Sequence, residues 1–560
     1  MSAKIIVLKF GSSVLHTDAD SPNAVHEIYR WVRVGYRVIA VVSAIGEATD
    51  RLIVRSGLLS LKPEPFAIAE LLATGERASA ALVGIALDRA GVPARVLNPR
   101  EISLTVAGPP LDSRLVSVDV ARLTELLDAV PVLVIPGFFG TDSAGRTHLL
   151  GRGGSDLSAV FLAHALSARC RLIKDVDGVY ESDPARCTGT LPRRFTTLNY
   201  TDALHVAGPL IQPKAVAYLS EHGDRAEVAA LARSYESAVH SVATELCTSQ
   251  AAQPLKVLLL GLGTVGFGVY QRLLGNRDHF EVVGALVREC AKYERLGVPV
   301  KLLHAEPEHV LGLQPDIVVD ALPGAEPSRD LVEQFFAGGT HVVSANKALI
   351  GAHGPGLLAL AQEHGAIIRY SAAVGGATPM IEIVDQLVEY PIERLAAVLN
   401  GTCNFVLDAC ADGATLAQAI AEAKVHGFAE ADATEDLNGS DAERKLRILC
   451  RHVFHAEPKS INVEVLDEAV GRRAHEAAAT GQRLRQIARS TRSTGYLHAQ
   501  VTFEIVETDS LFGRLTREWN ALEIIDAAGN PHRVTGRGAG RWPTTEAVMA
   551  DLFDIHRYRG

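Results

Sequence analysis

The stretch from Leu255 to Leu274, LKVLLLGLGTVGFGVYQRLL, decides how the C-terminal half of this 560-residue chain folds. An apolar strand runs into a glycine-rich turn that opens a helix, which is the context of a dinucleotide-binding turn. Gly261 permits the tight turn, Gly263 lets a pyrophosphate approach the backbone, and Gly266 lets the helix pack on the strand. The predicted cofactor-binding residues of this turn are Gly261, Gly263, Thr264, Val265 and Gly266.

The next apolar strand, Glu281–Val287, ends in Arg288-Glu289. In this fold an acid at that strand end binds the ribose 2′-hydroxyl of NAD, whereas an arginine accommodates the 2′-phosphate of NADP. Because Arg288 comes first, we favour NADP and expect Arg288 to contact it. Glu289 leaves NAD open as the alternative.

Composition and charge exclude several classes of protein. Hydrophobic residues make up 48% of the chain and charged residues 21%, which is a globular profile with apolar side chains for several cores. The net charge of −10 argues against nucleic acid as the main partner. No apolar run approaches the roughly 18 residues of a membrane span. The seven cysteines form no CxxC pair, which argues against a disulfide framework or structural zinc and favours the cytoplasm.

Apolar strands alternate with helical segments in both halves, which indicates an α/β fold. We expect an open sheet with helices on both faces, then a Rossmann domain and an α+β substrate domain. The polar segment CTSQAAQP separates the halves. The predicted parts are residues 1–247, a linker at 248–254, a dinucleotide-binding domain at 255–380 completed by 536–560, and a substrate domain at 381–535.

The first half contains four expected buried parallel strands, at residues 5–10, 37–44, 130–140 and 170–176. Between them we expect helices over Ala24–Val34, Phe66–Ala90 and Ser155–Leu166. Residues 218–247 are expected to be mostly helical. The last helix of the chain is expected to begin near Thr544 or Thr545.

An acidic segment, GFAEADATEDLNGSDAERK at residues 427–445, precedes another expected helix. Ser440 and Glu443 have the spacing of a capping box, so this helix should begin near Ser440. Asp441 and Lys445 are then one turn apart on one face. By spacing alone the pattern favours an ordinary ion pair on a solvated helix. The preceding dinucleotide turn and the five acids around the glycine-rich loop instead favour a catalytic site.

The C-terminal half resembles homoserine dehydrogenases over residues 255–560. The resemblance is carried by GLGTVG, VVSANKALI, YSAAVGGATPMIE, NGTCNFVLD, GFAEADATEDLNGSDAERK and GRGAGRWPTTEAV. It implies NAD(P)-dependent interconversion of aspartate semialdehyde and homoserine. It further implies that Lys445 transfers the proton, that Lys347 assists, that Glu430, Asp436 and Asp441 bind substrate, and that Ser344, Lys347 and Gly538 contact the cofactor.

Two stretches of this half depart from the family pattern. Ser371 stands where many relatives have an acid, just before a turn whose backbone carbonyls bind a cation. The resemblance still implies an Na⁺ or K⁺ site at Val374, Gly376 and Thr378. After the third cofactor strand the usual Thr-Gly is replaced by the run from Asp320 to Gly324, which includes a proline.

The N-terminal half has no Walker loop, yet it has other glycine-rich turns. Lys9-Phe-Gly11-Ser12-Ser13 follows the first strand, and Leu150-Gly-Arg-Gly-Gly-Ser-Asp156 opens a helix, with Ser155 or Asp156 as its expected cap. Such turns at helix N-termini bind anions, and a lysine can neutralise a transferring phosphoryl group. Each motif by itself is equally a structural turn.

Together these motifs resemble aspartokinases of the amino acid kinase fold over about residues 1–215. The matching stretches are LKFGSS, VVSAIGEATDRL, LLATGERASA, GFFGTDSAGRTHLLGRGGSDLSA and DVDGVYESDP. The resemblance implies in-line transfer of the γ-phosphoryl group of Mg-ATP to the β-carboxylate of aspartate. It assigns aspartate binding to Ser43, Glu76 and Arg152, and ATP or phosphate binding to Lys9, Gly11, Ser12, Gly153, Gly154, Asp156, Asp175 and Asp177.

This half also departs from its family. The opening motif is one residue short, Lys174 replaces the usual threonine, and a phosphate-binding lysine is missing from residues 207–213 unless Lys214 substitutes. The paired regulatory ACT modules of relatives are absent between the halves. Three hypotheses about function remain. The chain is a bifunctional kinase and dehydrogenase, a dehydrogenase with a catalytically silent kinase-like module, or a dinucleotide-binding regulator that catalyses no reaction. The resemblance also implies a homodimer or higher homo-oligomer, in which the substrate domain is the dimerisation domain.

Overall fold

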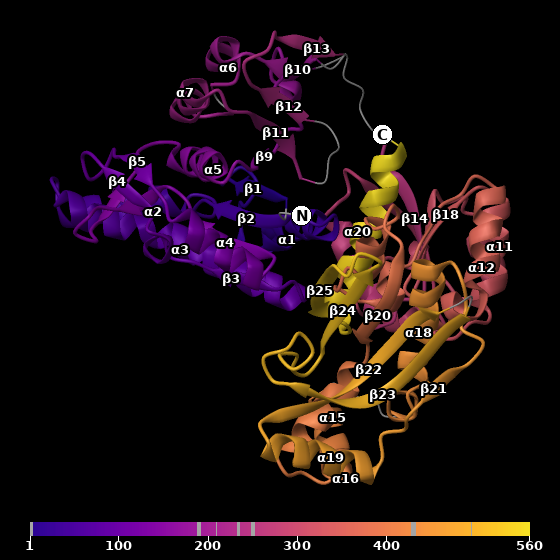
Figure 1. Cartoon of the computed structure of the whole chain (residues 1–560). Helices are drawn as coiled ribbons and strands as arrows, with labels where there is room; N and C mark the ends of the chain where they lie inside the picture. Colours follow the sequence, from indigo (N-terminus) through magenta and orange to yellow (C-terminus); the bar gives the residue numbers. More distant parts are fainter. Residues whose placement is uncertain are drawn as a thin grey trace. The chain divides into compact units, whose positions relative to one another are not determined.

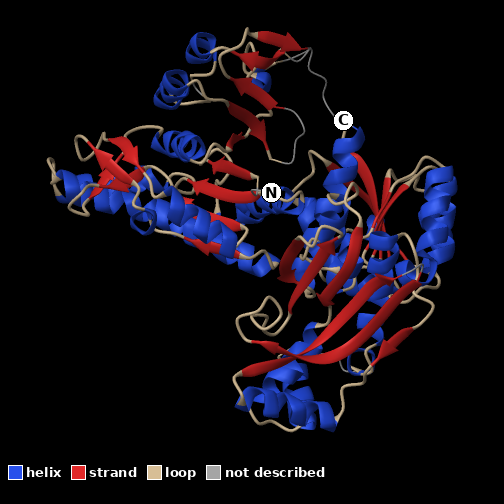
Figure 2. Cartoon of the chain, viewed as in Figure 1, coloured by secondary structure: helices blue, strands red, loops and turns tan. Residues whose placement is uncertain are grey.

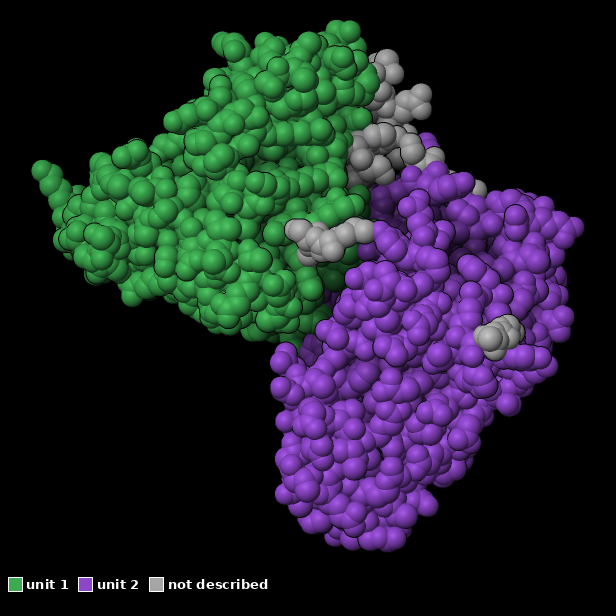
Figure 3. Space-filling view, viewed as in Figure 1, with its two compact units in different colours: residues 1–89, 93–252, 560 green, residues 90–92, 253–559 purple. Residues whose placement is uncertain are grey.

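The computed structural model describes residues 4–187, 192–208, 210–231, 236–247, 253–426, 433–493 and 496–559. These residues form two compact units, one of residues 4–89 and 93–247 and one of residues 90–92 and 253–559 (Figure 3). Helices and strands alternate through both units (Figure 2), which confirms the predicted α/β class. No helix among the described residues is long and apolar enough to cross a membrane.

A nine-stranded sheet in the order β13-β10-β12-β11-β9-β1-β2-β6-β3 forms the centre of the first unit (Figure 1). The predicted strands are present as β1 (Ile5–Phe10), β2 (Arg37–Val42), β6 (Val132–Pro136) and β9 (Arg169–Lys174), all parallel to their neighbours in this set. The sheet ends in the edge strands β3 (Ala94–Val96) and β13 (Glu245–Cys247). Between β13 and β9 lie β10 (Arg194–Leu198), β12 (Glu236–Val239) and β11 (Ala226–Ala230).

The helices of this unit include the three that were predicted. The described α-helices of this unit are α1 (Ser21–Arg33), α2 (Ala48–Leu59), α3 (Pro65–Ala90), α4 (Val120–Ala129), α5 (Gly154–Ala165), α6 (Tyr200–Val206) and α7 (Pro213–His222). The predicted ones are α1, α3 and α5. α5 packs on β1 and β9. Its N-cap is Gly153, in the left-handed region at φ 80°, so the expectation of Ser155 or Asp156 as the cap was wrong. Both lie in the first turn instead.

Two predictions for the first unit were wrong. Residues 218–247 are not mostly helical, because they contain β11, β12 and β13. The sequence of β11, AEVAA, has residues of good helix propensity, but the strand is buried between β9 and β12 and pairing overrides propensity. The expected strand at 130–140 is two strands, because Phe138 at φ 72° turns the chain. Its second part, β7 (Phe139–Thr141), joins β4 (Thr105–Ala107), β5 (Arg114–Ser117) and β8 (Thr147–Leu149) in a separate sheet.

The second unit begins with a six-stranded parallel sheet in the order β16-β15-β14-β17-β18-β19. Its strands are β14 (Leu255–Leu260), β15 (Phe280–Leu286), β16 (Leu303–His304), β17 (Ile317–Asp320), β18 (His341–Ser344) and β19 (Ile368–Arg369). The order reverses at β14, and in such sheets ligands bind beyond the carboxyl ends of the strands at the reversal. This arrangement puts the glycine turn after β14 at the expected place for a dinucleotide.

Helices cover both sides of this sheet, with α20 on one side and α11 and α12 on the other (Figure 1). The helices are α8 (Thr264–Leu274), α9 (Cys290–Glu294), α10 (Pro307–Leu311), α11 (Ser328–Ala337), α12 (Lys347–Glu363), α13 (Ser371–Val374), α14 (Met380–Asp385) and α20 (Arg541–Arg559). α20 begins at Arg541, directly after Gly540 at φ 109°, and therefore earlier than expected. It packs against α8, where Arg272 and Glu546 pair at 3.5 Å.

A second six-stranded sheet, β21-β23-β22-β20-β24-β25, follows in the chain. Its strands are β20 (Ile392–Val398), β21 (Ile461–Val463), β22 (Gln482–Ser493), β23 (Tyr496–Glu507), β24 (Trp519–Asp526) and β25 (Pro531–Arg537), antiparallel except for β21 with β23. Its helices are α15 (Gly401–Ala411), α16 (Leu416–Val425), α17 (Thr434–Leu437), α18 (Ser440–Phe454) and α19 (Glu468–Ala479). α15, α18 and α19 all pack against β22.

α18 begins at Ser440 as predicted, but the predicted capping box is not formed. The N-cap is Gly439, at φ 80°, and a Cβ added there would lie 2.4 Å from the side chain of Val463. Glu443 pairs instead with Arg447 at 2.9 Å. The close approach of β21 therefore decides how this helix starts.

Candidate active sites

The glycine turn after β14 has the geometry that a dinucleotide needs. Gly261 adopts φ 94°, which favours glycine, and a Cβ added to Gly266 would lie 2.0 Å from the carbonyl oxygen of Gly261. A Cβ added to Gly263 would meet nothing within 4 Å, so the space beside this residue is open. Thr264 and Val265 form the first turn of α8 behind it. The turn and the positive end of α8 thus fit a pyrophosphate.

The predicted ribose ligands lie beyond the end of β15. Arg288 and Glu289 both follow this strand and are exposed. β15 is the immediate neighbour of β14 in the sheet, so the end of this strand is beside the glycine turn. Both side chains are therefore free to contact the adenosine end of a dinucleotide.

A buried carboxylate, Asp441, gathers the catalytic candidates of the second unit. Only 2% of Asp441 is exposed, and its Oδ2 lies 2.8 Å from the Nζ of Lys445, one turn later on α18. Lys347, the first residue of α12, donates to Oδ1. The amide of Asn400 donates to Oδ2 at 2.9 Å and to Asp436 at 2.7 Å. The fold thus brings together four of the predicted residues, whereas Glu430 lies outside the described residues.

The charged groups of this cluster shift the pKa values of one another. Burial by itself raises the pKa of Asp441, but the ammonium groups of Lys445 and Lys347 outweigh it and hold that pKa well below its usual range. Burial alone lowers the pKa of Lys347, and the Asp441 carboxylate more than compensates, so the pKa is raised. At neutral pH the Asp441 carboxylate is therefore ionised and shared by two amines, with Lys347 protonated.

Lys445 is fixed by a second contact as well. Its Nζ donates to the carbonyl oxygen of Leu399 at 2.8 Å, and the amide of Asn520 donates to the same oxygen at 3.3 Å. Among the described residues these leave one of its three hydrogens without a partner. Gly538 lies against this group, because a Cβ added there would come within 1.8 Å of the Asn520 amide. Lys445 is thus oriented and still able to donate a proton.

Asn400 and Asn520 were not predicted as site residues. Asn400 follows β20 and caps α15 by accepting from the N–H of Cys403 at 2.8 Å. A polar NGTCN run directly after an apolar strand was the available signal for it. Asn520 lies within β24, where nothing in the local pattern distinguishes it.

The strand ends beside this cluster are linked by buried hydrogen bonds. The hydroxyl of Ser344, at the end of β18, donates to Asp320 at the end of β17 at 3.0 Å. Burial raises the pKa of Asp320 although several groups donate hydrogen bonds to it. Asn346 then caps α12 by accepting from the N–H of Leu349 at 3.1 Å. The end of β18 therefore positions Lys347, the residue that follows the cap.

The predicted cation turn is held by an unpredicted carboxylate. Ser371 donates from its N–H and hydroxyl to Asp551 of α20, at 3.1 and 3.0 Å, and Asp551 is fully buried. Position 371 is a serine where many relatives have an acid, and Asp551 of α20 supplies a carboxylate beside it. Within the turn, Gly376 has φ 55°, and the carbonyl oxygen of Thr378 accepts from the N–H of Met380 at 2.7 Å. The described residues contain no group of three His, Cys, Asp or Glu able to hold a metal.

In the first unit, the buried carboxylate of Asp156 pairs with two lysines, as Asp441 does in the second. Its carboxylate lies 2.8 Å from the Nζ of Lys9 and 3.1 Å from the Nζ of Lys174, and it accepts weakly from the N–H of Gln212 at 3.4 Å. Burial by itself raises its pKa, but the two lysines outweigh this and lower it. Gly11 accommodates the lysine, because a Cβ added there would lie 2.7 Å from the Nζ of Lys9. Lys174 was seen in the sequence only as a departure.

Glu76 on α3 is a buried acid near the same lysine. It is 3% exposed, and its Oε2 has no hydrogen-bond partner among the described residues. Burial raises the pKa of Glu76 to about 8, against the opposing effects of Lys9 and the N–H of Ala44. The N–H of Ser43, next to Ala44, donates to the carbonyl oxygen of Phe10 at 3.0 Å. The predicted aspartate ligands Ser43 and Glu76 thus lie beside the end of β1.

Other predicted residues of this unit lie at the rim of these strand ends. Ser12, Arg152 and Asp175 are exposed, while Asp177 accepts from the hydroxyl of Tyr180 at 2.5 Å. Gly153 and Gly154 form the start of α5. Lys214 is not brought to Asp156, because its Nζ is bound to Asp112 and to the carbonyl oxygen of Leu150.

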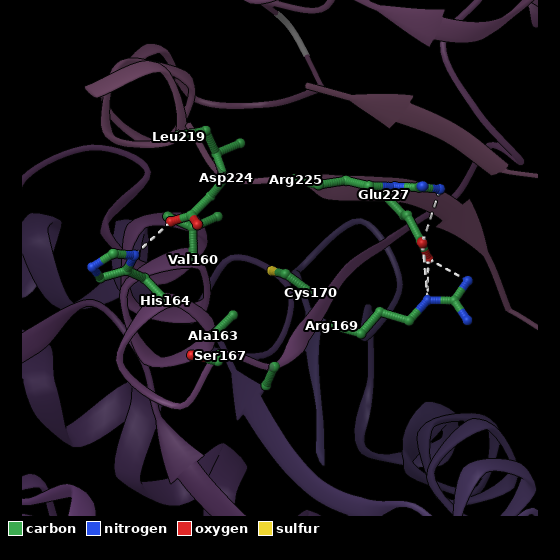
Figure 4. A pocket seen from close by; sticks show the side chains of 11 residues that line it. Val160, Ala163, His164, Ser167, Arg169, Cys170, Leu219, Asp224, Arg225 and Glu227 are labelled. Atoms are coloured by element: carbon green, nitrogen blue, oxygen red, sulfur yellow. Dashed lines mark hydrogen bonds and ion pairs between the residues drawn. The ribbon is translucent and has the colours of Figure 1, made fainter. Parts of the chain in front are cut away.

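A separate cavity of about 360 Å³ lies at the start of β9, whereas Lys174 is at the end of this strand (Figure 4). Its charged side chains pair with one another. His164 lies 2.8 Å from Asp224, and Glu227 lies 2.7 Å from Arg169 and 3.3 Å from Arg225. This cavity is therefore not the place where the predicted phosphate ligands gather.

Three family models match the chain. The homoserine dehydrogenase model matches residues 379–553, and the model of the homoserine dehydrogenase NAD binding domain matches residues 261–371. The amino acid kinase family model matches residues 4–228. Each of the two units thus has its own match.

Individual relatives agree with these matches. A homoserine dehydrogenase of Pseudomonas aeruginosa is 32% identical over 326 residues, which are 54% of this chain and 73% of the relative. A crystal structure of a homoserine dehydrogenase from Thiobacillus denitrificans is 35% identical with a TM-score of 0.52, over 56% of this chain and 75% of that one. An aspartokinase of Helicobacter pylori is 38% identical over 204 residues, which are 36% of this chain and half of the relative.

Proposed function

This chain belongs to the homoserine dehydrogenase family, and on this premise we propose that it catalyses two reactions. The second unit reduces aspartate semialdehyde to homoserine with a nicotinamide cofactor. The first unit phosphorylates the β-carboxylate of aspartate with Mg-ATP. The single observation that supports the first of these best is the pair of lysines on the buried carboxylate Asp441.

The bound cofactor supplies a hydride to the aldehyde carbon of the substrate. The oxygen of this aldehyde then gains negative charge and needs a proton. Lys445 donates it from Nζ, directly or through one water, and stabilises the charge as it forms. Its contacts with Leu399 and Asp441 hold the amine in one orientation during this step. Lys445 is therefore the general acid for reduction and the general base for the reverse reaction.

Substrate binding uses the remaining groups of the cluster. The amino group of the substrate is cationic and is held by carboxylates, for which we assign Asp441, Asp436 and Glu430. Lys347, kept protonated by Asp441, orients the substrate carboxylate. We assign NADP as the cofactor because Arg288 is exposed at the end of β15.

Transfer in the first unit needs no proton movement. An oxygen of the aspartate β-carboxylate attacks the γ-phosphorus, and the bond to the oxygen between the β- and γ-phosphorus breaks. ADP leaves with the electron pair, and aspartyl phosphate forms. Lys9 neutralises charge on the transferring group, while Glu76 and Ser43 hold aspartate. We assign residues 1–247 to this activity, and we expect the whole chain to act as a homodimer in the cytoplasm, as its family resemblance implies.

Two assays on the purified full chain test this proposal. Oxidation of NADPH should depend on aspartate semialdehyde, and hydroxamate formation should depend on both ATP and aspartate. Both activities are expected. Loss of the first overturns the dehydrogenase assignment. Robust NADPH oxidation without hydroxamate formation means that the first unit is a silent module.

A further inference from the structure

Two buried lysines share one buried carboxylate at the strand ends of the first unit. Lys9 and Lys174 are 7% and 8% exposed, and both pair with Asp156, which is 2% exposed. One carboxylate cannot neutralise two ammonium groups, and burial of the excess charge is costly. Glu76 does not supply the missing anion at neutral pH, because burial raises its pKa to about 8. The site is therefore built for an anion that arrives from outside.

The backbone directs such an anion to one place. Lys9 and Lys174 lie near the carboxyl ends of β1 and β9, which are adjacent parallel strands. Asp156 lies in the first turn of α5, a helix of 12 residues that starts with Gly153 and Gly154. Helix N-termini carry a partial positive charge and unpaired N–H groups. Both lysines thus converge on the end of α5 that favours phosphate.

We propose that Lys174 is a second phosphate-binding catalytic residue, which acts with Lys9 on the phosphate chain of a nucleoside triphosphate. This inference rests on the proposed kinase function of the first unit. Asp156 holds both amines apart and in position until the nucleotide binds. During transfer, Lys174 neutralises charge on the phosphate oxygens, as Lys9 does, and no proton changes place.

Lys174 fits this role better than the other lysine in this region. Lys214 is engaged by Asp112 and by the carbonyl oxygen of Leu150, and its side chain is 40% exposed. Lys174 instead is buried against the same carboxylate as Lys9. Burial and the neighbouring Lys9 lower the pKa of Lys174, partly countered by Asp156, so a bound phosphate would favour its charged form.

The test compares Lys174→Met and Lys174→Arg with the wild-type full chain. Lys62→Met, at an exposed lysine of the same unit, is the matched control. We measure hydroxamate formation, the Kd of Mg-ATP by calorimetry, thermal unfolding, and NADPH oxidation as a check that the second unit is intact. For Lys174→Met we expect kcat to fall about 10²-fold or more and the Kd to rise about tenfold. Lys174→Arg should recover part of the loss, and Lys62→Met should match wild type.

Each outcome decides for or against the proposal. Wild-type kcat and Mg-ATP affinity in Lys174→Met would overturn it, and tighter binding or faster turnover would show that Lys174 obstructs the site. If wild type binds Mg-ATP but forms no hydroxamate, the kinase function fails, while weaker binding by Lys174→Met still supports the phosphate contact. If wild type binds no Mg-ATP, both fail.

Discussion

The Nζ of Lys445 lies 2.8 Å from the Oδ2 of Asp441, and Lys347, nearly a hundred residues earlier, donates to the other oxygen of the same carboxylate. Asp441 thus joins the start of α12 to the first turns of α18. Lys347 follows β18 of the parallel sheet, whereas Lys445 lies on α18, after β20 of the second sheet. The contact of both lysines with Asp441 therefore depends on the tertiary fold. The predictions that follow depend on this cluster or on the groups that surround the two nucleotide turns.

Asp441→Asn keeps the shape of the side chain and removes its charge. Both lysines then lose their anion, the pKa of Lys347 falls, and the substrate amine loses a ligand. We expect kcat/KM for homoserine to fall about 10²-fold, since buried charge-assisted bonds are lost. Steady-state kinetics measure this. Asp385→Asn, which removes the 2.9 Å pair with His452 elsewhere in the unit, is the control and should change kcat/KM little.

The glycines of the cofactor turn should separate binding from folding. A Cβ at Gly263 meets nothing, so Gly263→Ala should keep the wild-type melting temperature and raise the Kd of NADPH about tenfold or more by occupying the pyrophosphate space. A Cβ at Gly266 collides with the carbonyl of Gly261, so Gly266→Ala should unfold several degrees earlier. Thermal unfolding and fluorescence titration measure the two effects. Unchanged NADPH binding in Gly263→Ala would place the pyrophosphate elsewhere.

Arg288→Ala tests the choice of cofactor. If Arg288 holds the 2′-phosphate, the KM for NADPH should rise about tenfold, because a charge-assisted contact of roughly 1.5 kcal/mol is lost. The KM for NADH should stay within about twofold. Parallel titrations of both cofactors measure the ratio. An equal change for the two cofactors argues against a role of Arg288 in selecting NADP.

Glu76 should make aspartate binding depend on pH. Its pKa is raised to about 8 by burial, so the carboxyl is protonated below this value and can bind the substrate ammonium group only above it. The KM for aspartate should therefore fall as pH rises towards 8, by up to about tenfold per unit. Glu76→Gln should have a high KM that no longer changes with pH. A wild-type KM that is constant over this range contradicts the assignment.

Much of the fold could be predicted from the sequence because strong local patterns determine it. The strand and glycines at Leu255–Gly266 and the apolar strands of the first unit are consistent with both propensity and burial. The errors arose where tertiary contacts override local preference. β11 pairs as a strand despite its alanines. The N-cap of α18 is Gly439, where β21 comes close, and the capping box predicted at Ser440 does not form.

The candidate sites were predictable only in part, for the same reason. Motif spacing identified Asp441 and Lys445, the family resemblance added Lys347, and the fold brings the three together. Asn520 and Asp551 could not be found, because each reaches the site from a segment that is distant in sequence. The sequence showed Lys174 as a departure from the family pattern, but its position beside Lys9 depends on the pairing of β1 with β9.

The central claim is that Lys445 transfers the proton that accompanies the hydride, and Lys445→Met tests it most directly. The variant keeps the length of the side chain and removes its proton. We expect kcat for NADPH oxidation with aspartate semialdehyde to fall about 10²-fold or more, while the Kd of NADPH stays within about twofold. A kcat close to that of wild type would contradict the account.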